Sequence, residues 1–271
     1  MVYQRNNYCN IFASIKNMTL SIIKEKVIIG RVGHGEVYYI SNKPKIAYKQ
    51  THTECVELKK EYNNLNLAYL KYIEYTEYKL GIRNKAQILK PSNWEKNGFG
   101  CKFQLSRVKP VYGKYTTQAY IGETETPNMD KIIKIGDAIR GRYMGPNILK
   151  KYAKVEILAE MSGVLMAIVQ YGAKLDGLDI ELIIGKVDDK DTIKLYLIDF
   201  DQTNLWEDPT NEEERKTLIM NLSYALIAET YFPNINSKYH ASFVKGYLEV
   251  AKFFDYLSLA NEVIADMTDI Y

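Results

Sequence analysis

The segment Ile29–Tyr38 reads IGRVGHGEVY and places Gly30, Gly33 and Gly35 between two stretches rich in β-branched and aromatic residues. This pattern predicts two antiparallel strands joined by a glycine-rich turn. Glycines in such a hairpin let backbone N–H groups approach phosphate oxygens without a side-chain clash. Three glycines alone are more typical of a simple tight turn, so the interpretation depends on the residues that follow.

A third strand is predicted over Lys45–Gln50, and it carries Lys49. A helix is expected next, over Thr53–Tyr72, with its first residue as the N-cap. Glu61 lies on this helix, twelve residues after the lysine. A strand lysine paired with a helix glutamate is how a kinase-type fold holds a cation against nucleotide phosphates. The alternative is a surface lysine near a solvated acidic helix face.

Two acidic motifs occupy the second half of the chain. Gly172–Ile184 reads GAKLDGLDIELII and contains Asp176 and Glu181, and Leu195–Gln202 reads LYLIDFDQ and contains Asp199. Carboxylates at the ends of adjacent strands can converge on Mg²⁺, a hard cation that prefers oxygen ligands. The alternative is that turn-forming aspartates simply end the strands. For an aspartate directly after an apolar Leu-Ile pair, burial alone is a poor explanation.

The order glycine hairpin, strand lysine, helix glutamate, loop aspartate and strand-end aspartate resembles the protein-kinase-like superfamily. The resemblance is nearer to the aminoglycoside- and choline-type phosphotransferases than to typical protein kinases. It implies ATP and Mg²⁺ as cofactors. It also implies site roles: Gly30, Gly33, Gly35, Lys49 and Glu61 bind the nucleotide, Asp176 is catalytic, and Asp199 and Glu181 bind the metal.

Several short motifs are similar, in the same order, to a fungal family of unknown function whose members are sometimes labelled zinc-finger proteins. They are Phe103–Val108, Ala119–Gly122, Leu178–Leu182, Leu197–Gln202, Tyr231–Pro233 and Phe243–Leu248. The cysteines and histidines are scattered and lack the spacing of zinc ligands, so we expect no zinc.

Length and patterning predict the domain organisation. The 271 residues suffice for one large domain or two packed lobes. We predict an α+β, two-lobed, protein-kinase-like fold. Residues 1–105 would form a lobe with a five-stranded antiparallel sheet and one helix, and residues 106–271 a mainly helical lobe, hinged near Arg107. The expected strands of the first lobe are Val27–Gly30, Glu36–Ile40, Lys45–Gln50, Ala86–Leu89 and Lys102–Val108, with a loop at Pro91–Gly100.

The second lobe is expected to contain two strands among several helices. The strands are Ile180–Ile184 and Leu195–Ile198, and the helices are Asn128–Ile139, Ala153–Gln170, Glu212–Phe232, Lys238–Tyr256 and a last one ending at Met267. Thr210 with Glu213 predicts a capping box at the start of the third helix.

Composition indicates an ordinary globular protein. Apolar residues make up 46% and charged residues 25%, and the net charge of +3 is too balanced to imply nucleic-acid binding on its own. The basic stretch Arg140–Lys154 could still contact nucleic acid or an acidic partner, although a solvated face is the simpler interpretation. The longest apolar run, Gly163–Val169, is far shorter than a membrane span of about 20 residues. Cys9, Cys55 and Cys101 are odd in number and far apart, so we expect free thiols, a reducing compartment and a cytoplasmic location without membrane attachment.

Two functions remain open. The chain departs from the kinase pattern at Val32, Lys174, Glu181 and Asp201, which favours a catalytically degenerate protein that acts by binding a macromolecular partner. Its bias towards residues with A/T-rich codons, including 23 Tyr, suggests a mobile element such as a yeast killer plasmid. The specific hypothesis is a self-immunity factor that binds the subunit of a tRNA-cleaving toxin. The alternative is an active ATP- and Mg²⁺-dependent phosphotransferase of the aminoglycoside or choline kinase type.

Overall fold

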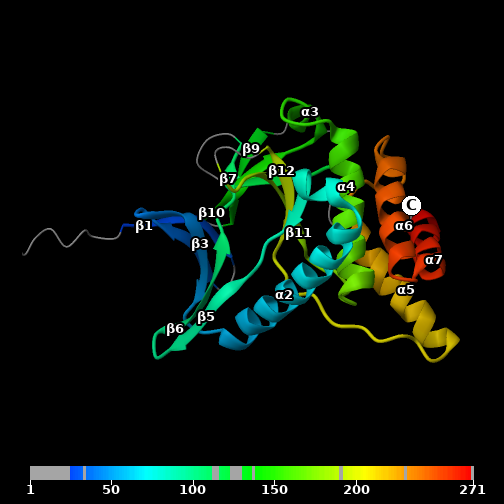
Figure 1. The fold of residues 1–271 in the computed structure, drawn as a ribbon, viewed down its shortest axis with the longest axis horizontal. Helices are drawn as coiled ribbons and strands as arrows, with labels where there is room; N and C mark the ends of the chain where they lie inside the picture. The colour runs from blue at the N-terminus through cyan, green and yellow to red at the C-terminus, as the bar shows by residue number, and fades with distance from the viewer. Residues whose placement is uncertain are drawn as a thin grey trace, which may run out of the picture.

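A computed structural model describes residues 25–32, 35–111, 116–122, 130–135, 138–188, 192–228 and 231–269. Gly33 and Cys9 lie outside these residues. Helices and largely antiparallel sheet make the protein α+β, as predicted. Figure 1 shows sheet at one end of the molecule, the helices α4 to α7 gathered at the other, and the long helix α2 running between them.

The first sheet has five strands in the order β1-β2-β3-β6-β5, each paired antiparallel with its neighbour. The strands are β1 Lys26–Val32, β2 Gly35–Ile40, β3 Lys43–Thr51, β5 Ser92–Asn97 and β6 Gly100–Ser106. Val32 pairs with Gly35, so the predicted glycine-rich hairpin is present.

The fifth strand of this sheet is not the predicted one. β5 lies within the segment expected to be a loop, because its polar residues form an exposed edge strand that lacks the apolar signal of a strand. The segment expected to be that strand forms β4, Ala86–Ile88, which pairs parallel with β12 in the second sheet. Ala86 and Ile88 are fully buried there.

A second sheet has seven strands, and all of them except β4 lie in the part of the chain expected to be mainly helical. Two of these, β11 and β12, are the strands predicted there. The order of the sheet is β4-β12-β11-β8-β10-β9, with β7 paired to β11. The strands beyond β4 are β7 Lys109–Pro110, β8 Thr117–Ala119, β9 Asp130–Ile135, β10 Ala138–Met144, β11 Glu181–Lys186 and β12 Lys194–Ile198. The helix predicted over Asn128–Ile139 is therefore wrong. Isoleucines at 132, 133, 135 and 139 favour the paired strands β9 and β10 instead.

The helices largely follow the prediction. They are α2 Cys55–Tyr78, α3 Pro146–Leu149, α4 Val155–Ala167, α5 Glu212–Ile227, α6 His240–Phe253 and α7 Leu257–Asp269. The predicted caps are shifted by one residue: Glu54 precedes α2 without a side-chain cap, and the Asn211 side chain accepts a hydrogen bond from the Glu214 N–H at the start of α5. Glu214 in turn accepts from the N–H of Thr210, the residue before the N-cap.

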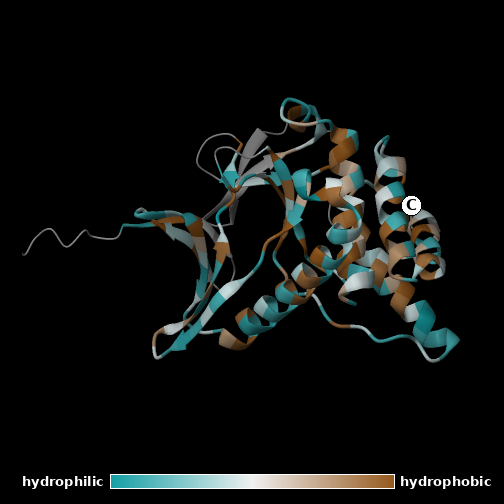
Figure 2. Ribbon diagram, viewed as in Figure 1, coloured by the Kyte–Doolittle hydropathy of each residue, from teal (hydrophilic) through white to brown (hydrophobic). Residues whose placement is uncertain are grey.

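The hydrophobic core centres on α4, which continues as a π-helical turn over Ile168–Gly172. Among the described residues, the stretch Val155–Gly172 is the one helix long and apolar enough to cross a membrane, but 78% of it is buried inside the fold. This burial is that of a core helix. Figure 2 shows hydrophobic residues along α4 and its neighbours, and hydrophilic residues at the outer end of α5.

Two glycines bring α4 and α6 into close contact. A Cβ atom added at Gly163 would lie 2.1 Å from the carbonyl oxygen of Phe243, and one added at Gly246 would lie 2.1 Å from that of Glu160. Both neighbours are backbone atoms, which cannot rotate away. Because these two positions have no side chains, the two helices can pack this closely.

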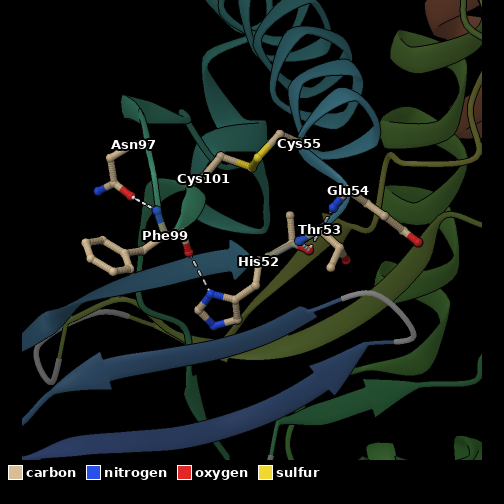
Figure 3. The surroundings of a disulfide bond; sticks show 8 residues. His52, Thr53, Glu54, Cys55, Asn97, Phe99 and Cys101 are labelled. Atoms are coloured by element: carbon tan, nitrogen blue, oxygen red, sulfur yellow. Dashed lines mark hydrogen bonds between the residues drawn. A yellow bond between two sulfur atoms is a disulfide. The ribbon is translucent and has the colours of Figure 1, made fainter.

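The cysteines differ from the prediction. Cys55, at the start of α2, forms a disulfide with Cys101 on β6, and their Cα atoms are 5.7 Å apart (Figure 3). The expectation that these two are free thiols is wrong, because strand pairing brings Cys101 opposite Thr51 at the end of β3, just before α2 begins. The two cysteines are 46 residues apart in the chain, so the sequence alone does not show that they are neighbours.

Candidate functional site

A buried cluster of three charges joins the two sheets. The Lys49 ammonium donates to Glu61 Oε1 at 2.7 Å and to Asp199 Oδ1 at 2.7 Å. The three residues are 8%, 3% and 7% exposed. The predicted ion pair between strand lysine and helix glutamate is thus present, and the strand-end aspartate completes it.

Each member of this cluster is placed by a different element. Lys49 follows the buried Ala47 and Tyr48 on β3, in register with Phe103 of β6. Glu61 lies on the buried face of α2 with Leu58 and Leu65, at the helical spacing of three and four residues.

Asp199 directly follows β12 and has φ of 66°. This left-handed conformation is uncommon for residues other than glycine, and aspartate and asparagine tolerate it best. Position 199 therefore favours aspartate or asparagine through its backbone conformation as well as through its side-chain contact with Lys49.

Burial and charge pairing shift the ionisation of the cluster. Burial raises the pKa of Glu61 to about 7, although Lys49 opposes the shift. Burial acts to lower the pKa of Lys49, but the carboxylates of Asp199 and Glu61 outweigh it and hold that pKa above its usual value. The lysine therefore stays cationic at neutral pH, while the glutamate titrates near it.

The cluster lines a cleft that is otherwise mostly apolar. About 110 Å³ of it is open to the centres of water-sized molecules, several times the roughly 10–15 Å³ that one water needs. The polar side chains that line it include Lys49, Glu61, Gln118, Glu181 and Asp199. The apolar side chains include Ile29, Val37, Ala47, Leu105, Ile183 and Ile198.

The described glycines of the hairpin have different surroundings. Gly30 lines the cleft. Gly35 instead packs against β3, where an added Cβ would lie 2.3 Å from the carbonyl oxygen of Gln50. It also borders a smaller cavity lined by Glu54, Glu57 and Asp201. Close backbone packing is therefore sufficient reason for glycine at position 35.

Glu181 lies beside Asp199 at the cleft, because β11 and β12 pair with Glu181 opposite Ile198. Its Oε2 accepts a hydrogen bond of 2.6 Å from Gln118 Nε2, which comes from β8. Gln118 was not anticipated as a site residue, since β8 has only three residues and gives no clear strand signal.

Asp176 does not join this group. Its Oδ1 accepts from the N–H groups of Leu178 and Asn204, and its Oδ2 accepts from the Asn204 amide at 3.0 Å. Among the described residues, no three His, Cys, Asp or Glu side chains lie close enough together to hold a metal ion. The expected convergence of Asp176, Glu181 and Asp199 on one ion is therefore not seen in this part of the chain.

A second unanticipated residue, Asn64, joins α2 to the segment after Asp199. Its amide donates to the carbonyl oxygen of Thr203 at 3.0 Å and to the Thr203 hydroxyl at 2.8 Å. Asn64 is a polar residue on the buried face of α2, one turn after Glu61. A polar asparagine at a position where the helical pattern expects an apolar residue is the sequence feature that could have indicated this contact.

Comparison with known proteins adds no relatives: no protein-family model matches the chain, and no curated protein matches it.

Proposed function

We propose that this protein has a two-lobed, protein-kinase-like fold and binds a nucleoside triphosphate, such as ATP, in the cleft lined by Lys49 and Asp199. The cluster of Lys49, Glu61 and Asp199 carries the proposal. A buried ion-pair network adds little stability compared with apolar packing, so its presence at a cleft is better explained by ligand binding. The cationic lysine would bind phosphate oxygens, and the apolar walls would pack against a planar base.

Mg²⁺ would fit the carboxylates at the phosphate end of this cleft. Asp199 and Glu181 supply hard oxygen donors from two paired strands. Protein Mg²⁺ sites often use only one or two carboxylates and complete the coordination with phosphate oxygens and water. When bound, the ion would neutralise phosphate charge, and Lys49 would hold the phosphates in place.

Binding, rather than phosphoryl transfer, is the primary activity in this proposal. A catalytic aspartate must accept or orient an acceptor hydroxyl. Asp176 already accepts three hydrogen bonds, two at Oδ1 and one at Oδ2, from the Leu178 N–H and from the Asn204 backbone and side chain, so about one of its four acceptor positions is left for a hydroxyl. The intact contacts of Lys49 with Glu61 and Asp199 favour the alternative, an active phosphotransferase.

The biological role that we propose is self-immunity in the cytoplasm, through binding to a toxin subunit. Its support is the bias towards amino acids with A/T-rich codons, the similarity to short motifs of a fungal family and the departures from the kinase motifs. A protein that binds a nucleotide can still bind a toxin subunit through its surface without transferring a phosphoryl group.

Equilibrium dialysis of the full chain with ATP, with and without Mg²⁺, tests nucleotide binding. We expect the native protein to bind, and Lys49→Met to bind at least tenfold more weakly once circular dichroism shows that it is folded. Lys45→Met is the matched control, because Lys45 lies on the same strand in an exposed pair with Asp188. If native protein binds neither ATP nor GTP at millimolar concentration, the proposal is wrong.

A further inference from the structure

The Cys55–Cys101 disulfide joins the helix that carries Glu61 to the sheet that carries Lys49. Cys55 is the first residue of α2, and Glu61 follows six residues later, or about 9 Å along the helix axis. Cys101 pairs with Thr51, and Phe103 of the same strand pairs with Lys49. The bridge and the buried charge cluster are therefore neighbours on the same two elements.

Besides the bridge, the buried side chain of Leu58 packs in the hydrophobic core from the first turn of α2, and the helix begins without a side-chain cap. Glu54, at the N-cap, makes no side-chain capping hydrogen bond. The Thr51 hydroxyl accepts from the N–H groups of Thr53 and Glu54 at 3.4 Å, which is long for a hydrogen bond. Uncapped helix ends fray readily. The covalent bond at Cys55 instead tethers this end of the helix to β6.

We infer that Cys55 and Cys101 form a reversible thiol–disulfide switch that controls the position of α2 and, through Glu61, the contacts of Lys49. In the oxidised form the tethered helix keeps Glu61 in the cluster. In the reduced form the first turns of α2 can separate from β6. Glu61 then exchanges its contact with Lys49 for water, and Lys49 is left with Asp199.

One of the two bridged cysteines is partly exposed, so a reductant can approach the disulfide. Cys55 is partly exposed, whereas Cys101 is only 3% exposed. Val56, next to Cys55 in the chain, is 77% exposed, and Phe99, two residues before Cys101 (Figure 3), is 85% exposed. Cys55 is thus the more exposed of the two cysteines, which makes its sulfur the better point of attack.

The step is a thiol–disulfide exchange with a dithiol reductant of the thioredoxin class. One thiolate of the reductant attacks the Cys55 sulfur, the bond to Cys101 breaks, and Cys101 leaves as a thiolate that takes up a proton. The second thiolate of the reductant then attacks the mixed disulfide and releases Cys55, which is protonated. Two electrons and two protons pass to the protein, and the reductant becomes a disulfide. The reverse exchange restores the bridge.

Hydrogen exchange on the full chain tests this inference without requiring a nucleotide. The protein is equilibrated with oxidised or reduced dithiothreitol, and maleimide labelling reports the state of each cysteine. We expect reduction to accelerate amide exchange in residues 56–61 at least tenfold, with little change in α6. Cys9→Ser is the control that leaves the bridge intact. Cys101→Ser should exchange like the reduced native protein under both conditions.

Two results would overturn the inference. One is a bridge that millimolar dithiothreitol does not reduce in the folded protein. The other is a reduced protein whose residues 56–61 exchange as slowly as in the oxidised form. Nucleotide affinity is a separate measurement that rests on the proposed function, and there we expect reduction to weaken ATP binding about tenfold. If exchange responds but neither form binds ATP, the switch stands and the proposed function fails.

Discussion

The ammonium nitrogen of Lys49 lies 2.7 Å from a carboxylate oxygen of Asp199, although 150 residues separate the two in the chain. Lys49 belongs to the first sheet, and Asp199 follows a strand of the second. One buried contact therefore links the two sheets and also lies at the candidate binding cleft. Changes at this contact should affect both stability and ligand binding.

Removal of the lysine charge should strongly destabilise the protein. Lys49→Met leaves the carboxylates of Glu61 and Asp199 buried without their cation, which typically costs about 3–5 kcal/mol. Lys45→Met breaks an exposed pair and should change the free energy of unfolding by about 1 kcal/mol or less. Urea denaturation of both variants measures the difference. Equal effects would mean that the buried cluster is not ionised as described.

Glu61 should make stability depend on pH. Its pKa is raised by burial from 4.5 to about 7, so between these values the folded protein holds a proton that the unfolded chain releases. The free energy of unfolding from this group therefore falls as pH rises from 4.5 to 7, by at most about 1.4 kcal/mol per pH unit. Glu61→Gln should lack this contribution, and Glu57→Gln, an exposed glutamate one turn earlier, should retain it. Urea denaturation at pH 5, 6 and 7 gives the comparison, and equal slopes in native protein and Glu61→Gln would contradict the prediction.

The elements that sequence patterns predict well are the long or strongly periodic ones. The hairpin before Gly35, the strand with Lys49 and the helix with Glu61 all have clear local signals, and the structure has them close to the predicted positions. The strands β7 and β8 have two and three residues, too few for alternation to stand out. Their pairing depends on neighbours that are distant in the chain.

The sequence predicts which residue types form the site, but it does not predict fully which of them lie together. Lys49, Glu61 and Asp199 occur in an order that indicates a shared site, and they meet. Asp176 follows the same order, yet the Asn204 side chain and backbone hold its carboxylate. Such a contact between two loops has no periodic pattern in the sequence. The Cys55–Cys101 bridge was missed for a similar reason, since the register of β3 with β6 creates it.

Gly163→Ala should destabilise the contact between α4 and α6. The added Cβ would lie 2.1 Å from a backbone oxygen of Phe243, so the helices must separate, and overpacking of this kind costs roughly 1–3 kcal/mol or more. Gly81→Ala is the matched control, because nothing lies within 4 Å of a Cβ at that position. Thermal denaturation of the two variants should show a clear loss for the first alone. A melting temperature for Gly163→Ala equal to that of native protein would mean that the helices are less closely packed.

Asn64→Ala should loosen the segment that follows Asp199. The Asn64 amide donates to the carbonyl and hydroxyl oxygens of Thr203, and loss of a buried donor of this kind costs about 1–3 kcal/mol. Asn63→Ala, at the exposed neighbouring position, should change stability by less than about 0.5 kcal/mol. Limited proteolysis near residues 200–204 and urea denaturation measure the two effects. Equal protection of this segment in both variants would contradict the assigned role.

A pair of conservative substitutions distinguishes binding from phosphoryl transfer. Asp176→Asn and Asp199→Asn each remove one charge and preserve side-chain size, and asparagine tolerates the left-handed backbone at position 199. If the protein acts by binding a toxin subunit, cells that express Asp176→Asn should retain protection against the toxin, because that carboxylate performs no chemistry. Asp199→Asn should weaken nucleotide binding. It should reduce protection only if the surface that binds the toxin subunit forms when nucleotide is bound. The measurements are cell survival under toxin, protein abundance and ATP turnover by purified protein. If both variants are folded and abundant yet lose protection, and native protein turns over ATP, phosphoryl transfer becomes the better account and the binding-only proposal is wrong.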